Sequence, residues 1–371
     1  MMLFLRQLRR TNFPGTLSLL ALILIVLSAQ TGTAQTLSST DLQEQTQQSV
    51  DRLQHWYNQK TGLWDKTGWW NSANVLTVLI DYAHVTGSLL AEPVAANTHT
   101  LNAKDGFLND YYDDEGWWAL AWIDAYDLTG NKQYLDTAES IFHNMTTGWD
   151  NTCGGGIWWS KKRTYKNAIA NELFLSVAAH LANRVADPDQ SKAYLKWARR
   201  EWKWFRHTGM IEQDHLISDG LDSSCKDNHK TKWSYNQGVI LGGLSELSHK
   251  TGKKKLLRTA QKTADAAMVK LADKNGILHD PCEPKCGADG TQFKGIFVRN
   301  LSLLNQTAPQ QRNAEFIVRN AESILTKDQS ADHAFGVVWS GPSTEADPST
   351  QSSALDALVA ALKLEMKGNG E

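Results

Sequence analysis

The sequence predicts an all-α protein built as one double ring of helical hairpins, an (α/α)6 toroid. Segments that are apolar on every side alternate with segments that are apolar on one face, as expected for an inner and an outer ring. A weak internal repeat supports this, because residues 128–135 resemble residues 250–257. In both copies an apolar segment ends at a glycine and an amphipathic one begins at once, which predicts a left-handed helix cap. A helical solenoid fits less well because the connecting loops are unequal in length.

The expected helices follow one another along the chain, and no long strand pattern interrupts them. Residues 35–58 begin with hydroxyl side chains suited to capping and are apolar on roughly one face, whereas residues 71–90 are apolar nearly all round. The same alternation continues through residues 115–128 (buried), 132–145 (amphipathic), 167–182 (buried), 192–205 (amphipathic), 233–247 (buried), 254–271 (amphipathic), 294–304, 310–325 and 353–364. The long loops of such a barrel are expected to leave one rim and line a central cleft.

The first residues are typical of a secretory leader. Three arginines precede an apolar run of about eleven residues, and small residues follow through Ala34. We therefore expect a signal peptide over residues 1–34 and a secreted, extracellular protein, with an uncleaved signal anchor as the alternative. Residues 35–371 are expected to form a single (α/α)6 catalytic domain with no membrane association after cleavage.

Charge excludes some classes of partner. The chain has 38 basic and 40 acidic residues, and removing residues 1–34 removes three arginines and no acid, which leaves 35 − 40 = −5. Such a balance disfavours nucleic acid and anionic lipid as partners. The last eight residues are polar, so we expect no C-terminal lipid-anchor signal. A monomer is the expectation.

Four cysteines in a secreted chain predict two disulfides, for which three connectivities are possible. We favour a local Cys282–Cys286 bridge and a long-range Cys153–Cys225 bridge. A metal site is the weaker alternative because no histidine pair lies near at ligand spacing. Candidate glycosylation acceptors, if the host is a eukaryote, are Asn144, Asn300 and Asn305.

The segment from Tyr111 to Trp118 is the strongest candidate site. Three acids, Asp113, Asp114 and Glu115, stand between aromatic pairs just before an apolar helical pattern. Two carboxyl groups beside aromatic faces suit glycosidic-bond hydrolysis, because one can protonate the leaving oxygen while the other attacks or stabilises the cation. A solvated acidic turn in front of a helix is an equally good interpretation of this segment alone.

Several motifs carry a resemblance to a known family when taken in order: Tyr112-Asp113-Asp114-x-x-Trp117-Trp118, Cys153-Gly154-Gly155-Gly156-Ile157-Trp158-Trp159, Lys166-Asn167-Ala168, Tyr235-Asn236-Gln237-Gly238 and Phe293 to Arg299. The sequence resembles glycoside hydrolase family 76, the secreted α-1,6-mannanases and related fungal cell-wall enzymes, over nearly all of the chain after the leader. The resemblance implies an (α/α)6 fold and endo-cleavage of α-1,6-linked mannan with retention of configuration. It also implies Asp113 as nucleophile, Asp114 as general acid/base, and mannan polysaccharide or oligosaccharide as the partner. We expect no cofactor and no metal.

Physical chemistry constrains this assignment. Retention requires carboxyl groups about 5–5.5 Å apart, whereas neighbouring side chains on a regular helix point about 100° apart. At least one aspartate is therefore expected just outside the helix. A helix N-terminus favours the ionised form, but two carboxyls this close cannot easily ionise together, which raises one pKa. The residues alone do not say which aspartate takes which role.

The remaining candidates are polar side chains that could bind sugar hydroxyls and aromatic rings that could stack on a sugar. The polar ones are Asn71, Asn74, Asn167, Asp219, Asp222, Asn236 and Gln237, and the rings are Trp117, Trp158 and Tyr235. Capping is an equal alternative for Asn74, Asn167 and Asp222. His215 and His229 share one loop, but solvated histidines are commoner there than metal ligands. About half of the 15 tryptophans are expected to fill the core.

Two other functions stay open. The same fold could carry a mannan-binding protein or a cell-wall transglycosidase. It could also carry an unsaturated-uronide hydrolase, which would need basic residues in the cleft. The quoted loops offer only Lys161, Lys162, Arg163 and Lys294, so this last function is disfavoured.

Overall fold

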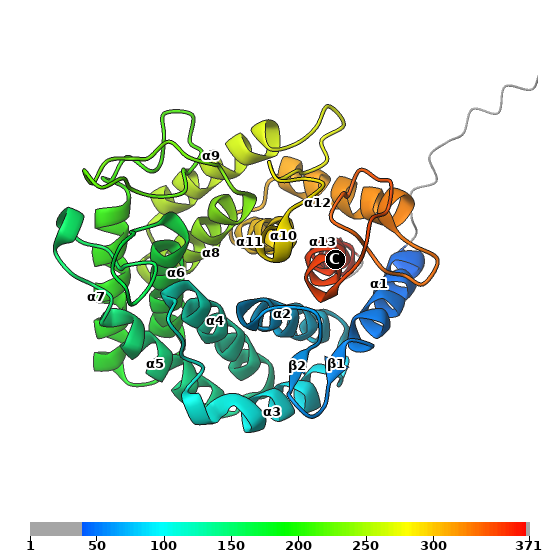
Figure 1. Cartoon of the computed structure of the whole chain (residues 1–371), viewed down its shortest axis with the longest axis horizontal. Coiled ribbons are helices and arrows are strands. Elements are labelled where there is room, and N and C mark those ends of the chain that lie inside the picture. Colours follow the sequence, from blue (N-terminus) through cyan, green and yellow to red (C-terminus); the bar gives the residue numbers. More distant parts are fainter. Residues whose placement is uncertain (1–38, 369–371) are drawn as a thin grey trace, which may run out of the picture. The chain divides into compact units, whose positions relative to one another are not determined.

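An inner ring of helices surrounds the axis of the molecule in the computed structural model, which describes residues 39–368 (Figure 1). The described members of this ring are α2 (Trp69–Thr86), α4 (Tyr112–Thr129), α6 (Ala168–Arg184), α8 (Ser234–Thr251), α11 (Phe293–Thr307) and α13 (Pro348–Gly368). Each packs on the next, and α13 packs on α2, so the ring closes. The predicted signal peptide lies outside the described residues.

An outer ring covers the inner one, with one outer helix packed on each inner helix. Its members are α1 (Ser39–Gln54), α3 (Ala91–Asn102), α5 (Lys132–Thr146), α7 (Pro188–Phe205), α9 (Lys254–Lys270) and α12 (Gln311–Ser323). The predicted (α/α)6 toroid is confirmed. Among the described residues, no helix is both long enough and apolar enough to cross a membrane.

The predicted glycine caps are present where inner helices end. Gly130 and Gly252 follow α4 and α8 with φ of 70° and 65°, and each donates its backbone N–H to a carbonyl four residues earlier. Gly87 ends α2 in the same way. This left-handed conformation favours glycine because it has no Cβ. An outer helix then starts within a few residues, so the repeat seen in the sequence is a structural repeat.

The helix α3 is the one outer helix that local sequence patterns do not predict. Its residues are mostly polar or small, and Pro93 lies within it. Proline is tolerated in a first helical turn because the N–H it lacks would have no partner there. The helix is completed by packing against α2 and α4, which a local pattern does not report.

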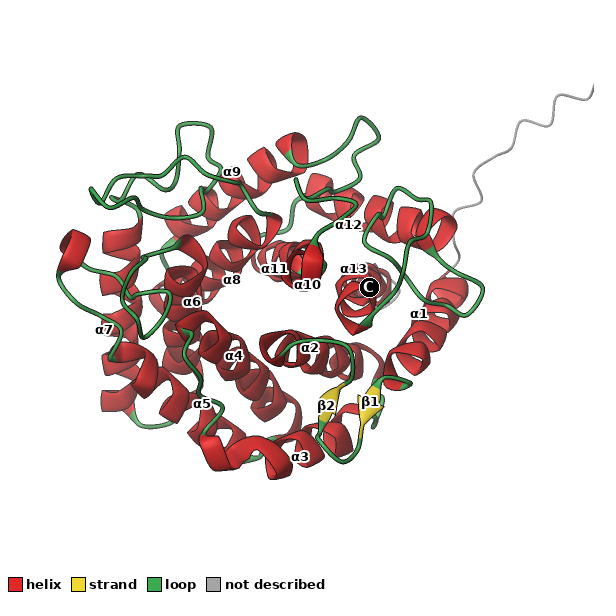
Figure 2. Ribbon diagram, viewed as in Figure 1, coloured by secondary structure: helices red, strands yellow, loops and turns green. Residues whose placement is uncertain are grey.

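The long connections all run from an outer helix to the next inner helix and therefore gather at one rim (Figure 2). After α1 the connection is a hairpin of β1 (Tyr57–Asn58) and β2 (Leu63–Trp64). Single antiparallel bridges such as Trp149↔Ile157 and Ile211↔Ile217 mark comparable hairpins in later connections. Short helical turns complete the rim: η1 (Ala103–Asp105), η2 (Thr152–Gly154), α10 (Gly287–Gly290) and η3 (Ile324–Asp328).

Amide side chains in the inner ring hold these hairpins. Asn171, the fourth residue of α6, accepts from the N–H of Ile157 (2.7 Å) and donates to its carbonyl (3.0 Å). Gln237, the fourth residue of α8, makes the same pair of bonds to Ile217 (2.7 and 2.9 Å). Both hairpin residues are fully buried, so these bonds satisfy backbone groups that water cannot reach.

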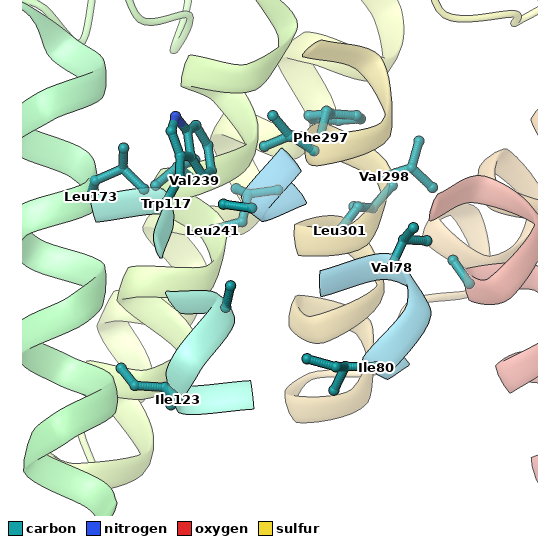
Figure 3. Packing of buried hydrophobic residues seen from close by; sticks show 14 of the residues in the cluster. Val78, Ile80, Trp117, Ile123, Leu173, Val239, Leu241, Phe297, Val298 and Leu301 are labelled. Carbon is teal, nitrogen blue, oxygen red and sulfur yellow. The ribbon is translucent and has the colours of Figure 1, made fainter. Parts of the chain in front are cut away.

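The core lies between the rings and contains seven of the 15 tryptophans, which agrees with the expected half. Figure 3 shows Trp117 in this core, beside Leu173 and Val239. The Cys153–Cys225 and Cys282–Cys286 disulfides are both formed, as predicted. Of the candidate glycosylation acceptors, Asn305 is buried and Asn144 and Asn300 are half-buried.

Candidate active site

The two candidate catalytic aspartates both lie in the first turn of α4, directly after its N-cap residue Tyr111. The expectation that one of them would lie outside the helix was therefore wrong. The first turn can hold both because its backbone N–H groups have no partner within the helix and favour negative charge. All inner helices point their N-termini toward this rim, since every long connection enters there.

Asp113 is held by a residue from a different loop. Its Oδ2 accepts a hydrogen bond from the indole Nε1 of Trp159 (2.9 Å), and its buried Oδ1 has no hydrogen-bond partner. The loop is fixed in turn, because the carbonyl of Trp159 accepts from the N–H of Tyr112 (2.9 Å). Burial, with the charge of Asp114 beside it, raises the pKa of Asp113 well above its usual value. One oxygen of Asp113 is thus left without a partner within the protein.

Asp114 faces a different set of partners. Its Oδ2 accepts from the side-chain amide of Asn109 (2.5 Å). Burial raises the pKa of Asp114 to about 6, although the Asn109 bond lowers it, and the charge of Asp289 raises it further. Asp289 is exposed in α10 and accepts from the indole Nε1 of Trp70 (3.0 Å). Sequence reasoning missed Asp289; its place just before an inner helix was the signal available.

Because both pKa values are raised, Asp113 and Asp114 together hold a single proton over a range above about pH 6. A pair with one proton can supply one acid and one carboxylate at the same time. Burial raises the pKa of both carboxyls, so this single proton belongs to the pair and not to one named residue.

Glu115, the third acid of the segment, is bound to neighbouring side chains. It is fully buried and forms an ion pair with Lys161 (2.9 Å). The amide of Asn144, in the orientation that satisfies both groups, donates to its two oxygens (3.2 and 3.0 Å). Burial raises the pKa of Glu115 to about 7 even so. Glu115 therefore ties α4 to its neighbours.

Aromatic rings flank the pair. Tyr111 and Trp159, each 37% exposed, lie with ring centres 5.0 Å apart, and Tyr165 meets Trp159 edge-on. A second group begins with Tyr235, whose ring stacks on Phe293 at 3.8 Å. Burial and the charges of Asp113 and Asp219 raise the pKa of Tyr235, which shows that its hydroxyl feels the charge of Asp113. Rings of this kind can bury the apolar face of a sugar.

The three aromatic rings predicted to stack on sugar differ in how far they are buried and in what they contact. Tyr235 is half-buried in the second group of rings. Trp117 is only 3% exposed and is covered by Trp70, with ring centres 5.7 Å apart, so it belongs to the core beneath the cleft. Trp158 is half-buried and donates to Asp150 (2.7 Å), which leaves Trp159, not singled out from the sequence, as the ring that touches Asp113.

Several predicted sugar ligands are structural in this fold. Asn71 donates to Gln292 (3.0 Å) and Asn74 accepts from Arg299 (2.5 Å), both in the buried interior of the inner ring. Gln237 clamps the hairpin at Ile217. Each has its hydrogen-bonding capacity used within the protein.

Two further candidates cap local structure, as the alternative interpretation held. Asn167 caps α6 by accepting from the N–H of Ala170. Asp222 is exposed and accepts from the backbone N–H groups of Ser224 and Lys226, which lowers its pKa.

Asp219 and Asn236 keep features of binding groups. Asp219 is half-buried and accepts from the hydroxyl of Tyr165, the residue that packs on Trp159. Asn236 is fully buried, yet neither atom of its amide has a partner. Glu172, which was not predicted, has the same property, and burial with the charge of Asp219 raises its pKa well above its usual value. An unpartnered buried polar group is costly unless water or a ligand completes it.

The loop between α7 and α8 contains a cluster that could hold a metal ion. The ligand atoms of Glu212, Asp227 and His229 lie within 4.8 Å of one another. Lys232 already forms an ion pair with Glu212, and the Nδ1 of His229 lies 3.1 Å from Glu212 and 3.0 Å from Asp227. These acids thus already have partners within the protein. His215 of the same loop is exposed and outside the cluster.

Comparison with known proteins gives the family. The sequence profile described as Glycosyl hydrolase family 76 matches residues 40–369. The mannan endo-1,6-alpha-mannosidase DCW1 of Candida albicans is 28% identical over 273 residues, which cover 65% of this chain and 59% of that protein. The protein of the same name from Saccharomyces cerevisiae is 25% identical over 315 residues, which cover 76% of this chain and 69% of that protein. The chain thus spans 59% of the length of the Candida relative.

Solved structures show the same fold. An inactive variant of the α-1,6-mannanase GH76A of Salegentibacter sp. HEL1_6, in which two consecutive aspartates are replaced by alanine, was solved with alpha-1,6-mannotetrose. It superposes with a TM-score of 0.78 at 25% identity and covers 87% of this chain and 99% of that one. Dfg5 from Chaetomium thermophilum, in complex with glucosamine, has a TM-score of 0.79 at 19% identity, with 89% and 92% covered. Since the family profile spans nearly all of the chain, the chain belongs to glycosyl hydrolase family 76.

Proposed function

We propose that this protein is a secreted, retaining, endo-acting glycoside hydrolase that cleaves α-1,6-mannosidic linkages in mannan. The observation that carries the proposal is the pair Asp113 and Asp114, adjacent in one helical turn, desolvated, and flanked by aromatic rings. The mannotetrose complex of the Salegentibacter α-1,6-mannanase supports the substrate class. The names of the yeast relatives support the same linkage.

In the proposed mechanism Asp113 attacks the anomeric carbon while Asp114 gives its proton to the leaving oxygen. The glycosidic bond breaks, and a covalent bond forms between the sugar and Asp113. Asp114 then takes a proton from water, whose oxygen attacks the same carbon and releases Asp113. Two inversions give net retention. The Trp159 N–H and the helix N-terminus stabilise the ionised form of Asp113 that the first step needs.

The test is hydrolysis of unbranched α-1,6-mannan by Asp113→Asn and Asp114→Asn variants. Each is expected to lose all measurable release of reducing ends while its melting temperature stays near that of the wild type. Asp105→Asn is the matched control, because Asp105 is exposed in η1 and only weakly paired with Lys104. The configuration of the first product, followed by NMR, is expected to be α. Activity in either active-site variant, or a β product, would remove the proposal.

A transglycosidase is the second candidate, because two separate groups of aromatic rings lie near the pair and could hold an acceptor sugar as well as a donor. In that case a sugar hydroxyl, in place of water, would resolve the intermediate on Asp113. Product masses measured with excess acceptor oligosaccharide separate the two functions. Transfer products that dominate over hydrolysis at millimolar acceptor would assign the transglycosidase.

A further inference from the structure

A pocket of about 460 Å³ lies outside the catalytic site, between α7 and the rim loops that contain Cys153 and Cys225. Two half-buried indoles, Trp149 and Trp204, line it together with three exposed basic side chains of α7 and the turn after it. These side chains are Arg200, Lys203 and His207. We call this site the α7 pocket.

The charge around the α7 pocket contrasts with that of the whole chain, which has a net charge of −2. The exposed basic residues of α7 and the turn after it are Lys192, Lys196, Arg199, Arg200, Lys203, Arg206 and His207. Only Lys192 among them forms an ion pair within the described part of the chain, with Asp189. Glu201, the acid within this stretch, is fully buried and forms no ion pair with these side chains, and burial raises its pKa.

This arrangement does not help the helix itself. Lys196 and Arg200, and likewise Arg199 and Lys203, are four residues apart, and like charges at that spacing destabilise a helix. An anionic partner would relieve the repulsion. The nearby acid Asp222 does not do so, since its carboxylate is taken up by backbone N–H groups of its own loop.

The aromatic part of the α7 pocket is held in place. The guanidinium of Arg200 lies 4.2 Å from the ring centre of Trp149. The indole Nε1 of Trp204 donates to the carbonyl of Cys153 (2.9 Å), which fixes this ring against the disulfide loop. A ring wall beside cations matches a sugar that bears a negative group, because the ring covers the apolar face and the cations bind the charge.

One hairpin links the α7 pocket to the aspartate pair. Gly154 of this hairpin lines the pocket, and Trp159, five residues later, donates to Asp113. A glycan that leaves the cleft along the outer side of the hairpin would therefore meet the cations of α7.

We propose that the α7 pocket binds a phosphate-bearing mannose unit of the substrate chain. The proposal rests on the proposed function, since it assigns an anionic substituent to the same polymer. The pocket lies outside the catalytic pair, so it contributes to affinity and position and takes no part in bond cleavage.

The experiment compares mannan oligosaccharides of one length with and without a phosphate monoester. Binding is measured by calorimetry on the Asp113→Asn variant, so that the result does not depend on hydrolysis. The phosphorylated sugar is expected to bind about tenfold or more tightly at low salt, and the advantage should shrink at high salt. Arg200→Ala/Lys203→Ala should abolish the advantage and leave binding of the neutral sugar unchanged.

The matched control is Lys255→Ala/Arg258→Ala, which removes the same two side-chain types from the exposed face of α9. It should keep the full advantage. Lys203→Glu is a second variant. Lys203 does not stack on a ring as Arg200 does, so this change alters the charge alone and should make the neutral sugar bind more tightly than the phosphorylated one. Equal binding of the two sugars would overturn the proposal. So would an unchanged preference in the α7 variants, or equally tight binding of an oligonucleotide of the same charge. Loss of hydrolysis alone would affect only the proposed function.

Discussion

Trp159→Phe tests the electrostatic design of the site most directly. The substitution keeps an aromatic ring beside Tyr111 and removes only the indole N–H. That N–H is the one side-chain hydrogen bond of Asp113, whose other oxygen has no partner. A hydrogen bond to a charged group contributes about 1.5–3 kcal/mol. Without it, the arrangement in which Asp113 is ionised and Asp114 holds the proton becomes less favourable by that amount.

The proposed first step starts from this arrangement, so kcat/KM on α-1,6-mannan should fall about 10- to 100-fold. The fall should appear in kcat/KM across the pH range, because the proton moves within the pair and is not lost to solvent. Release of reducing ends by purified enzyme measures it, with a thermal melt to confirm folding.

Trp158→Phe is the matched control, because the neighbouring indole donates to Asp150 and not to the pair. Asp150 keeps its ion pair with Lys166 (2.9 Å), so the control should lose less than about threefold. An unchanged kcat/KM in Trp159→Phe would refute the idea that this bond selects the nucleophile.

Two further predictions follow from the same contacts. The kcat/KM–pH profile should fall below about pH 6, where the pair takes up a second proton. Asp289→Asn should move this fall to lower pH, because the charge of Asp289 raises the pKa of Asp114. Asn109→Leu should move it to higher pH, because the Asn109 hydrogen bond lowers that pKa. Gln237→Leu should lower the free energy of unfolding by about 2–4 kcal/mol in urea titration, since it strands the buried N–H and carbonyl of Ile217.

A specific result would contradict each of these two predictions. Profiles that shift in the same direction in both variants would mean that neither partner acts through the proton of Asp114. A stable Gln237→Leu protein with a raised KM would show that the amide binds sugar, as the sequence had suggested. Asp105→Asn serves as the charge control for the pH profiles, because Asp105 is exposed and is not among the groups that shift the pKa of Asp113 or Asp114.

Local patterns were sufficient for most of the fold. The alternation of apolar and amphipathic segments, with glycine caps at Gly130 and Gly252, predicts hairpins because these features depend on neighbours along the chain. The helix α3 was missed because its residues have no strong period of their own and it is completed by packing on α2 and α4. The two disulfides also agree with the pairing favoured from the sequence, one local bridge and one long-range bridge.

The same distinction between local sequence and tertiary contacts applies to the candidate site. The sequence by itself determined that Asp113 and Asp114 are adjacent and lie near the start of an inner helix, since both facts depend on one short segment. Only the tertiary structure decided that Trp159 and Asp289, from distant loops, act on the pair, and that Asn71, Asn74 and Gln237 are occupied within the protein. An amide that binds sugar and an amide that clamps a hairpin have the same chemistry. What separates them is whether a backbone group from elsewhere in the chain reaches it first.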